Sequence, residues 1–419
     1  MTLQAVKGMK DILPGDIDRW QRLESAFRQQ VERYGFQEVR LPIVEPTALF
    51  VRSIGENTDI VEKEMYTFTD RGDKSLTLRP EGTASAVRAY VQHSVQAKEP
   101  VTKWYYLGPM YRRERPAKGR YRQFYQGGIE VFGDPGPYID GEVIDMVVRF
   151  IASLGIEDVE VVINSIGGPE TREAYRGALL AYLEPFRDKL CKDCQRRMDT
   201  NPLRVLDCKV PSCKEIAAGA PSILEQLTED DRTHFEGVQE TLTALDTPYR
   251  VDGSLVRGLD YYTRTLFEVL GKGGELGAQN ALLGGGRYDN MVKSLGGADV
   301  PAIGFAMGLE RLLMAMPETA AEPTIDAFIV AAQPSVRGEA TVLARELRDA
   351  GLRVESDLRG GSLKSQLRRA DKLGTPVALI LGEDEVAAGT VQVKDLTGKT
   401  QESAARGDVA ARVRGLVER

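Results

Sequence analysis

The sequence predicts an α+β protein built on an antiparallel sheet, followed by a smaller domain with an α/β pattern. Up to about residue 320, predicted strands follow one another with short polar connections, which is typical of antiparallel pairing. After Pro323, short apolar strands alternate with helices, which indicates a mostly parallel sheet. The expected division is a first domain of 1–168 with 251–320, a mostly helical insertion at 169–250, and a second domain at 324–419.

The first domain begins with a helix, a short strand and a hairpin. Residues 16–34 have apolar residues at helical spacing, and Gly35 ends the pattern. The segment "FQEVRLPIVEP" (36–46) follows as an edge strand, because its two prolines cannot donate to a sheet ladder. The turn "RGDK" then joins the strands of a hairpin, and a helix begins near Thr83.

Two long strands come next, at 101–114 and 121–133, joined by a polar loop. Further strands are expected at 158–164, 255–270, 278–285 and 301–306. In the second domain, strands are expected in "TIDAFIVAA", "LRVESDL" and "PVALILG", with helices between them. A boundary is expected near 317–324, and cations gather in the second domain at Arg359, Lys364, Arg368, Arg369 and Lys372. A solvated helix face and a nucleic-acid surface both explain this basic cluster.

The stretch from Tyr111 to Glu130 carries the strongest chemical signal. Its loop concentrates six cations against the single acid Glu114: Arg112, Arg113, Arg115, Lys118, Arg120 and Arg122. Crowded like charges repel one another unless they are solvated or meet polyanions. On the second strand, Gln126 and Glu130 share a face with a glycine between them, which favours close approach of a ligand. A flexible solvated loop is the alternative, but a pocket for an anion beside a cationic group is favoured.

Three other segments are ambiguous when taken alone. "LRPEGTASAV" places Glu81 and Thr83 where a helix begins, which a helix cap would explain equally well. Arg311 lies in the glycine-punctuated "PAIGFAMGLERLL", which packing would explain, and "LLGGGRYDNMV" reads as a turn. The chain contains no GxxxxGK[ST] phosphate loop.

Composition argues against several other kinds of protein. The net charge of −7 does not indicate nucleic-acid binding, although a local basic patch would matter more. Apolar runs are too short to cross a bilayer and no signal-peptide core is present, so a cytoplasmic protein without membrane contact is expected. The histidines, His93 and His234, do not lie in polar clusters, so no histidine base is expected.

The four cysteines lie close together in "CKDCQRRMDTNPLRVLDCKVPSC", at Cys191, Cys194, Cys208 and Cys213. The first pair has the C-x2-C spacing of a zinc knuckle, but the second has the looser C-x4-C spacing and no histidine is near. Free thiols in a helical insertion are therefore the favoured interpretation, zinc bound by the four cysteines is the alternative, and no metal ligand is assigned.

Taken together, these segments resemble the histidyl-tRNA synthetase family of class II aminoacyl-tRNA synthetases. "YGFQEVRLPIVEP" is similar to the first class II motif, which forms the dimer interface in that family. Residues 105–133 resemble the second, an arginine-bearing hairpin, and "PAIGFAMGLERL" resembles the third. "LVRGLDYYTRTLFE" and "LLGGGRYDNMV" resemble the two histidine-specific signatures, and the resemblance spans essentially the whole chain in order.

The resemblance implies that L-histidine is activated by ATP, with Mg²⁺, and transferred to tRNA(His) by a cytoplasmic homodimer. It implies that Arg112 and Arg257 hold the histidine carboxylate and the α-phosphate. The remaining implied contacts are Glu81, Thr83 and Gln126 for the α-amino group, Glu130, Tyr261 and Tyr262 for the imidazole, and Glu114, Arg120 and Arg311 for ATP. The implied fold is a class II antiparallel-sheet catalytic domain with a helical insertion, plus a C-terminal α/β anticodon-binding domain. In that setting the basic cluster of the second domain would contact tRNA.

Two alternatives remain beside this interpretation. One is the regulatory synthetase-like subunit of ATP phosphoribosyltransferase in histidine biosynthesis, which typically lacks the anticodon domain and loses arginines such as Arg112 and Arg311. The other is a related class II enzyme such as the prolyl one, which should lack "RGLDYYTRT". For one pocket to use both Arg257 and Tyr262, the chain must turn near Gly258, because residues five apart in a regular strand face opposite ways. A loop "VRGLD" followed by a strand at 261–270 is therefore expected.

Overall fold

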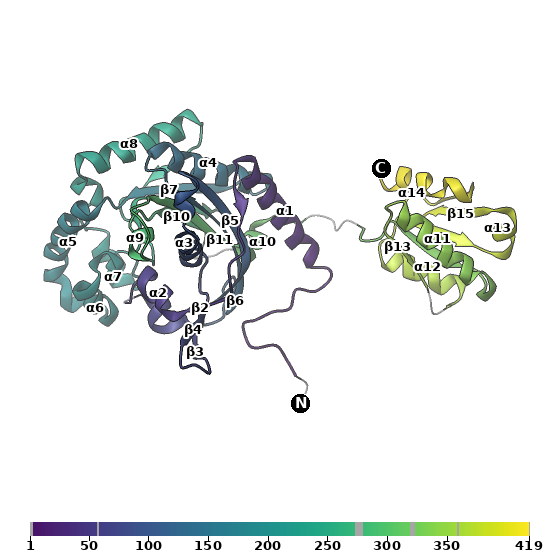
Figure 1. The fold of residues 1–419 in the computed structure, drawn as a ribbon, viewed down its shortest axis with the longest axis horizontal. Coiled ribbons are helices and arrows are strands. Elements are labelled where there is room, and N and C mark those ends of the chain that lie inside the picture. Colours follow the sequence, from purple (N-terminus) through teal and green to yellow (C-terminus); the bar gives the residue numbers. More distant parts are fainter. Residues whose placement is uncertain (1–2, 57, 273–279, 319–322, 358–359, 419) are drawn as a thin grey trace. The chain divides into compact units, whose positions relative to one another are not determined.

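A computed structural model describes residues 3–56, 58–272, 280–318, 323–357 and 360–418. The chain divides into two compact units, Met1–Glu318 and Thr319–Arg419 (Figure 1). Part of the boundary expected near 317–324 lies outside the described residues, as do Arg359 and the first two residues of the strand expected at 278–285.

An eight-stranded sheet forms the centre of the first unit, in the order β1-β5-β6-β11-β10-β9-β7-β8. Within this sheet, as far as it is described, the pairs β1–β5 and β7–β8 are parallel and the other neighbours are antiparallel. The antiparallel-rich α+β prediction is therefore confirmed. Its strands are β1 (Gln37–Glu38), β5 (Thr102–Tyr111), β6 (Gln123–Phe132), β7 (Val159–Ser165), β8 (Arg250–Val251), β9 (Thr263–Gly271), β10 (Ala281–Arg287) and β11 (Ala302–Gly308).

One face of this sheet is covered by three helices: α1 (Ile17–Arg33), α4 (Pro137–Ser153) and α8 (Glu229–Ala244) (Figure 1). The first of these forms where predicted because Leu23, Phe27 and Val31 recur at helical spacing and are all buried. The ring of Phe27 meets those of Tyr105 and Phe150 edge-on, which ties α1 to the sheet and to α4. This apolar layer fixes the sheet from behind and leaves the opposite face for a site.

The opposite face carries shorter elements. A second core packs under α2 (Thr47–Ile54), α3 (Thr83–Gln92) and α9 (Met291–Ser294). The segment 36–46, expected as one strand, instead forms β1 and then β2 (Val44–Pro46), because prolines at 42 and 46 interrupt the ladder. The predicted hairpin is present as β3 (Tyr66–Thr69) and β4 (Ser75–Leu78), and it joins β2 in a three-stranded sheet.

The chain from Leu255 to Tyr262 is a loop, and β9 begins only at Thr263. The turn expected near Gly258 is confirmed, while the strand starts two residues later than predicted. The helical region between β7 and β8 contains α5 (Pro169–Leu183), α6 (Lys192–Thr200), α7 (Pro211–Ala217) and α8, with short 3₁₀ turns between them. Its last helix shares the core of the sheet through Phe235, Val238 and Leu242, so only the part before α8 stands apart from that core.

The second unit is a five-stranded sheet in the order β13-β12-β14-β15-β16. One apolar core lies under α11 and α14, and a smaller one lies on the α12 side. The three strands predicted here are parallel, but β15 and β16 form an antiparallel hairpin that sequence reasoning missed, so the sheet is mixed. Its elements are β12 (Ala327–Ala331), α11 (Arg337–Asp349), β13 (Val354–Ser356), α12 (Leu363–Lys372), β14 (Val377–Leu381), α13 (Glu383–Ala388), β15 (Thr390–Asp395), β16 (Thr400–Ala405) and α14 (Val409–Val417).

A helix that crosses a bilayer must be both long and apolar. None of the described helices is long and apolar enough to span a membrane.

Candidate active site

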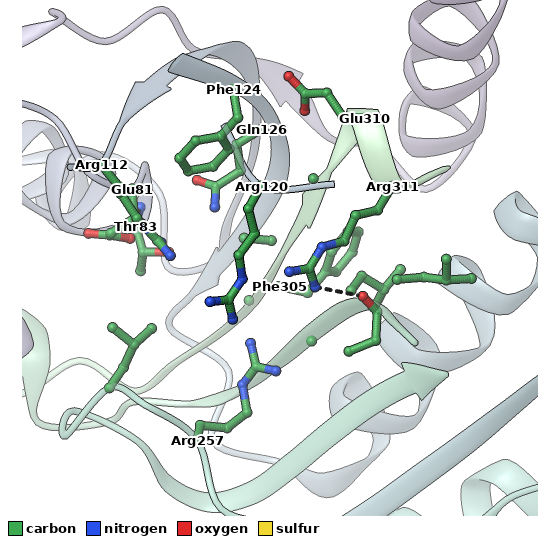
Figure 2. Close-up of a pocket in the computed structure, with 18 of the residues that line it drawn as sticks. Glu81, Thr83, Arg112, Arg120, Phe124, Gln126, Arg257, Phe305, Glu310 and Arg311 are labelled. Carbon is green, nitrogen blue, oxygen red and sulfur yellow. Dashed lines mark hydrogen bonds between the residues drawn. The ribbon is translucent and has the colours of Figure 1, made fainter. Parts of the chain in front are cut away.

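A cavity opens on the sheet face opposite α1, between strands β6, β10 and β11, the loop before β9 and the start of α3. Figure 2 shows side chains from these separate segments pointing into one space. Ten of the eleven residues predicted for the site line this cavity: Glu81, Thr83, Arg112, Glu114, Arg120, Gln126, Arg257, Tyr261, Tyr262 and Arg311. The eleventh, Glu130, lies behind the cavity wall and is fully buried.

Four arginines gather around the cavity. Figure 2 shows the guanidinium groups of Arg120, Arg257 and Arg311 converging, with Arg112 beside Glu81 and Thr83. Each is held by a partner: Arg112 Nε donates to the Pro80 carbonyl at 2.9 Å, and Arg311 Nη1 donates to the Ala281 carbonyl at 3.0 Å. These anchors fix the side chains before any ligand arrives, which reduces the ordering cost of binding.

The charge balance of the cavity favours an anion. The pKa of Arg311 is lowered by burial and then by the neighbouring charges of Arg120, Arg112 and Arg257. Positive groups crowded in this way repel one another until an anion enters. Arginine suits such a site because its planar fork binds phosphate or carboxylate oxygens bidentately and stays charged. The geometry therefore supports binding of a phosphorylated ligand and a carboxylate side by side.

Arg257 is positioned by an acid and by a glycine. It forms an ion pair with Glu268 of β9. Burial opposes its charged form, but Tyr262 and Glu268 outweigh that effect, so the pKa of Arg257 is raised. The guanidinium lies directly over Gly284 of β10, where any Cβ would overlap it. The glycine run in "LLGGGRYDNMV" resembled a turn when taken alone, although the strand expected at 278–285 included its first two glycines. In the structure it is a strand, and Gly284 provides space for Arg257.

Glu81 and Gln126 organise the N-terminus of α3 at the cavity. Glu81 accepts backbone N–H bonds from Thr83 at 2.7 Å and Ala84 at 2.9 Å, while Gln126 Oε1 accepts one from Gly82 at 3.0 Å. The cap at this helix is therefore the carboxylate of Glu81, not the hydroxyl of Thr83. Burial raises the pKa of Glu81, and the two backbone N–H bonds only partly offset that effect.

Glu130 is the centre of a buried hydrogen-bond network. The hydroxyls of Tyr106 (3.1 Å) and Tyr288 donate to its carboxylate, and Tyr288 lines the cavity. Burial raises the pKa of Glu130 to about 8, against the hydrogen bonds from Tyr288, Thr83 and Tyr106 that lower it. A Cβ on Gly304 would overlap this carboxylate, so the glycine of β11 makes room for it. Glu130 is therefore connected to the cavity through Tyr288, which lines the cavity and donates its hydroxyl to the carboxylate.

The raised pKa predicts a pH-dependent contribution of Glu130 to stability. The folded chain keeps this proton up to about pH 8, whereas the unfolded chain loses it near 4.5. Because the unfolded state binds fewer protons in that window, the contribution is present at low pH and is lost as pH rises from 4.5 to about 8. We expect the melting temperature of wild type minus that of Glu130→Gln to fall across this window and to level off above it. A difference that rose with pH would contradict the assignment.

Sequence reasoning missed three features of this region. Tyr288 was not predicted as a site residue, although it lies two residues after the glycine run and its ring meets that of Tyr261 edge-on. Tyr106, fixed against Glu130, was also missed, although it lies at the position opposite Gly128 on the paired strand. The expectation that His234 lies outside polar clusters was wrong: it is buried and bonds to Asp140 at 2.9 Å. His234 and Asp140 are not among the residues that line the cavity.

The arrangement defines a class of protein. An antiparallel sheet carries an arginine-bearing β5–β6 hairpin, and β11 runs into α10 (Leu309–Ala315) with Arg311 at the cavity. A separate α/β unit follows in the chain. These features, in this order, are those of a class II aminoacyl-tRNA synthetase.

Comparison with known families identifies the member of that class. The family model for histidyl-tRNA synthetase matches residues 8–168 and 202–312, and a model for the anticodon-binding domain matches 326–416. The histidine–tRNA ligase of Sorangium cellulosum is 56% identical over 402 residues, covering 96% of this chain and 94% of the relative. The histidine–tRNA ligase of Geobacter metallireducens is 49% identical, covering 95% of this chain and 96% of the relative. The chain belongs to the histidyl-tRNA synthetase family.

Solved structures agree with this assignment. The apo histidyl-tRNA synthetase of S. aureus superposes with a TM-score of 0.84 at 35% identity, covering 99% of this chain and all of that one. A Bacillus halodurans structure described as an ATP phosphoribosyltransferase regulatory subunit/histidyl-tRNA synthetase has a TM-score of 0.67 at 21% identity, covering 91% of this chain and 99% of that one. The second similarity concerns the fold alone. The regulatory-subunit alternative is thus less well supported than the ligase.

Proposed function

We propose that the cavity joins L-histidine to ATP to form histidyl-adenylate and that the chain then transfers histidine to tRNA(His). The observation that carries this proposal is the convergence of four anchored arginines beside a buried acid and tyrosine network. The arginines suit ATP and a carboxylate, and the acid and tyrosine network suits an imidazole. Incubation with ATP, tRNA(His) and labelled histidine should give histidine esterified to the tRNA. Failure to charge this tRNA under conditions that keep the chain folded would contradict the proposal.

The chemical step needs positioning and positive charge more than it needs an acid or a base. The histidine carboxylate attacks the α-phosphate in line, a new P–O bond forms, and pyrophosphate leaves with the electrons of the broken bond. Arg112 and Arg257 hold the attacking carboxylate and the α-phosphate and stabilise the charge that develops there. Arg311, with Arg120 and Glu114, positions the rest of ATP.

Recognition of histidine follows from the second half of the cavity. Glu81, Thr83 and Gln126 bind the α-amino group, and Tyr261 and Tyr262 contact the imidazole, with Glu130 behind the cavity wall. A site that pairs polar atoms of the side chain leaves buried groups unsatisfied when an isostere enters, which supports discrimination of roughly 10⁴–10⁵ without editing.

Mg²⁺ is the ion expected to accompany ATP. Carboxylate oxygens are ligands that this ion prefers, and Glu114 and Glu310 both line the cavity. Glu114 is at present ion-paired with Arg112 at 3.8 Å and Arg120 at 3.4 Å, and Glu310 accepts the backbone N–H of Tyr125, so an ion would compete with these partners. These two residues would hold Mg²⁺, which would neutralise phosphate charge when bound.

A homodimer in the cytoplasm is part of the proposal. The segment resembling the first class II motif leaves Ile43 and Val44 about 40% and 41% exposed, and Phe68 on the neighbouring β3–β4 hairpin is 44% exposed. Exposed apolar side chains that lie close together are typical of surfaces that bind another protein. Light scattering of the purified protein should give the mass of two chains, and a single-chain mass at micromolar concentration would contradict a stable dimer.

The second unit is proposed to bind the anticodon arm, with the helical region between β7 and β8 contacting the acceptor arm. On α12, Lys364, Arg368 and Lys372 are exposed and four residues apart, so they share one face. Reversing all three to Glu is expected to raise the KM for tRNA on the order of tenfold or more, because phosphate contacts are lost. Histidine-dependent ATP–pyrophosphate exchange should stay unchanged. Arg345→Glu on α11 is the matched control, and an equal effect there would contradict a role for α12.

A further inference from the structure

The four cysteines of the helical region meet at one point in the fold. Their sulfur atoms all lie within 4.8 Å of one another. They come from three separate places: Cys191 and Cys194 at the start of α6, Cys208 after the following 3₁₀ turn, and Cys213 in α7. Within the part of the chain that the structure describes, this is the one group of histidine, cysteine or acidic side chains found close enough to share a metal ion.

The sulfur spacing matches a tetrahedral metal site and does not match a disulfide. A zinc ion bound to four thiolates at about 2.3 Å holds its sulfurs about 3.8 Å apart. The Sγ atoms of Cys191 and Cys208 are 3.9 Å apart, whereas a disulfide would require about 2.05 Å. All four cysteines are free.

The sulfurs are mostly buried, and one backbone N–H is directed at them. Cys194, Cys208 and Cys213 are buried, and the backbone N–H of Cys191 donates to Cys213 Sγ at 3.2 Å. A hydrogen bond donated to sulfur stabilises its charged form. Three of the four cysteines are followed directly by an exposed lysine, at positions 192, 209 and 214. Their charge is opposite to that of a zinc tetrathiolate, and Lys209 also pairs with Asp207 at 3.2 Å.

We propose that Cys191, Cys194, Cys208 and Cys213 bind one Zn²⁺ as a closed tetrathiolate site. Four thiols lose their protons, four S–Zn bonds form, and no oxidation is involved. The ion is structural, because all four tetrahedral positions are taken by protein and none remains for a substrate. The convergence of the sulfurs replaces the expectation of free thiols, which rested on the loose C-x4-C spacing in the sequence.

The ion would join short helical elements within the apolar cluster of this region. The elements it joins are short: α6 has nine residues and α7 has seven. Small helical regions of this kind are often stabilised by a metal. Cys194, Cys208 and Cys213 belong to the same apolar cluster as Tyr262, which lines the cavity.

The same region also contacts the loop before β9. Asn201, directly after α6, donates to Asp260 of this loop at 2.8 Å. Zinc therefore positions the wall of the histidine pocket from behind. This consequence rests on the proposed function, whereas the metal site itself does not.

The experiment measures metal and thiols on the full-length protein before any activity. Elemental analysis of protein purified without chelator should give one zinc per chain, and a thiol reagent should react slowly until a chelator exposes four thiols. Replacing zinc with Co²⁺ should give the visible absorption of a tetrahedral cobalt thiolate, saturating at one equivalent. Cys194→Ser should lose zinc, while Thr200→Ala, on the same helix and exposed, should keep it.

Two results would overturn the metal site, and a third tests its consequence separately. Absence of zinc with four thiols that react at once in the native chain would overturn it, and so would iron in place of zinc. These readouts use the wild-type chain, so they decide the question even where Cys194→Ser fails to fold. If zinc is bound, chelation should raise the KM for histidine severalfold with little change in the KM for ATP. Equal changes in both would overturn the link to the histidine pocket and leave the metal site standing.

Discussion

Replacing Arg257 by alanine is expected to lower histidine-dependent ATP–pyrophosphate exchange by roughly 10²–10³-fold or more. The guanidinium lies over Gly284 in the cavity, held by Glu268, at the proposed position of the carboxylate and α-phosphate. Removing it takes away a preorganised positive charge where negative charge develops, and no other group moves in without rebuilding the site. Exchange kinetics, with circular dichroism to verify folding, measure the effect.

Arg257→Ala leaves the carboxylate of Glu268 without its partner, so this substitution needs a control. Arg257→Ala strands the carboxylate of Glu268, whose side chain is 20% exposed, and an unpaired buried charge is destabilising. The double variant Arg257→Ala/Glu268→Gln removes both charges and should regain thermal stability without regaining exchange. Arg250→Ala, which breaks an exposed pair with Glu160, should leave exchange unchanged. Near-normal exchange in either Arg257 variant would contradict the proposed role.

Glu130→Gln is expected to raise the KM for histidine by roughly 10–100-fold and to leave the KM for ATP within a few-fold. Leaving a buried donor or acceptor without its partner costs about 1–3 kcal/mol, which spans that range. The substitution keeps the size of the side chain but replaces an acceptor oxygen with a donor amide, beside two tyrosine hydroxyls that already donate. Steady-state exchange with each substrate varied in turn gives the two constants.

A surface variant with the same Glu→Gln change serves as the control for the selective rise in the KM for histidine. Glu142→Gln removes a carboxylate that pairs with Lys103 at a half-exposed position, and it should change neither constant. Equal losses of histidine and ATP binding in Glu130→Gln would mean that the residue supports the fold of the cavity and does not contact the imidazole.

The sheet of the first unit could be predicted because its signals are local. Paired apolar strands with polar turns specify antiparallel neighbours, as in β5 and β6, whose extent differs from the prediction only at the ends. The hairpin of β15 and β16 was missed because β16 is largely exposed and polar, "TQESAA", and lacks the alternation that marks a half-buried strand. The start of β9 was placed two residues early because tyrosines favour strands, whereas here they form the cavity wall.

The site was predicted from motifs more than from physical pattern. The basic hairpin loop and the alternation of Gln126 and Glu130 indicated a pocket, but nothing in the spacing placed Arg257 beside Arg311. The order of the strands brings these two arginines together, because β10 lies between β9 and β11. Gly284 of β10 leaves space for the side chain of Arg257. Tyr288 and Tyr106 were missed because their importance depends on which buried acid they meet. The cysteine site is similar, since its sulfurs meet only after α6 and α7 fold back.

The most direct test of the account is ATP–pyrophosphate exchange measured with each of the twenty amino acids in turn. The cavity combines arginines for a carboxylate and a phosphate with the Glu130 and tyrosine network for one side chain. Stimulation by histidine alone is the predicted result. Exchange with another amino acid, or no exchange with any of the twenty by a folded protein, would contradict the account.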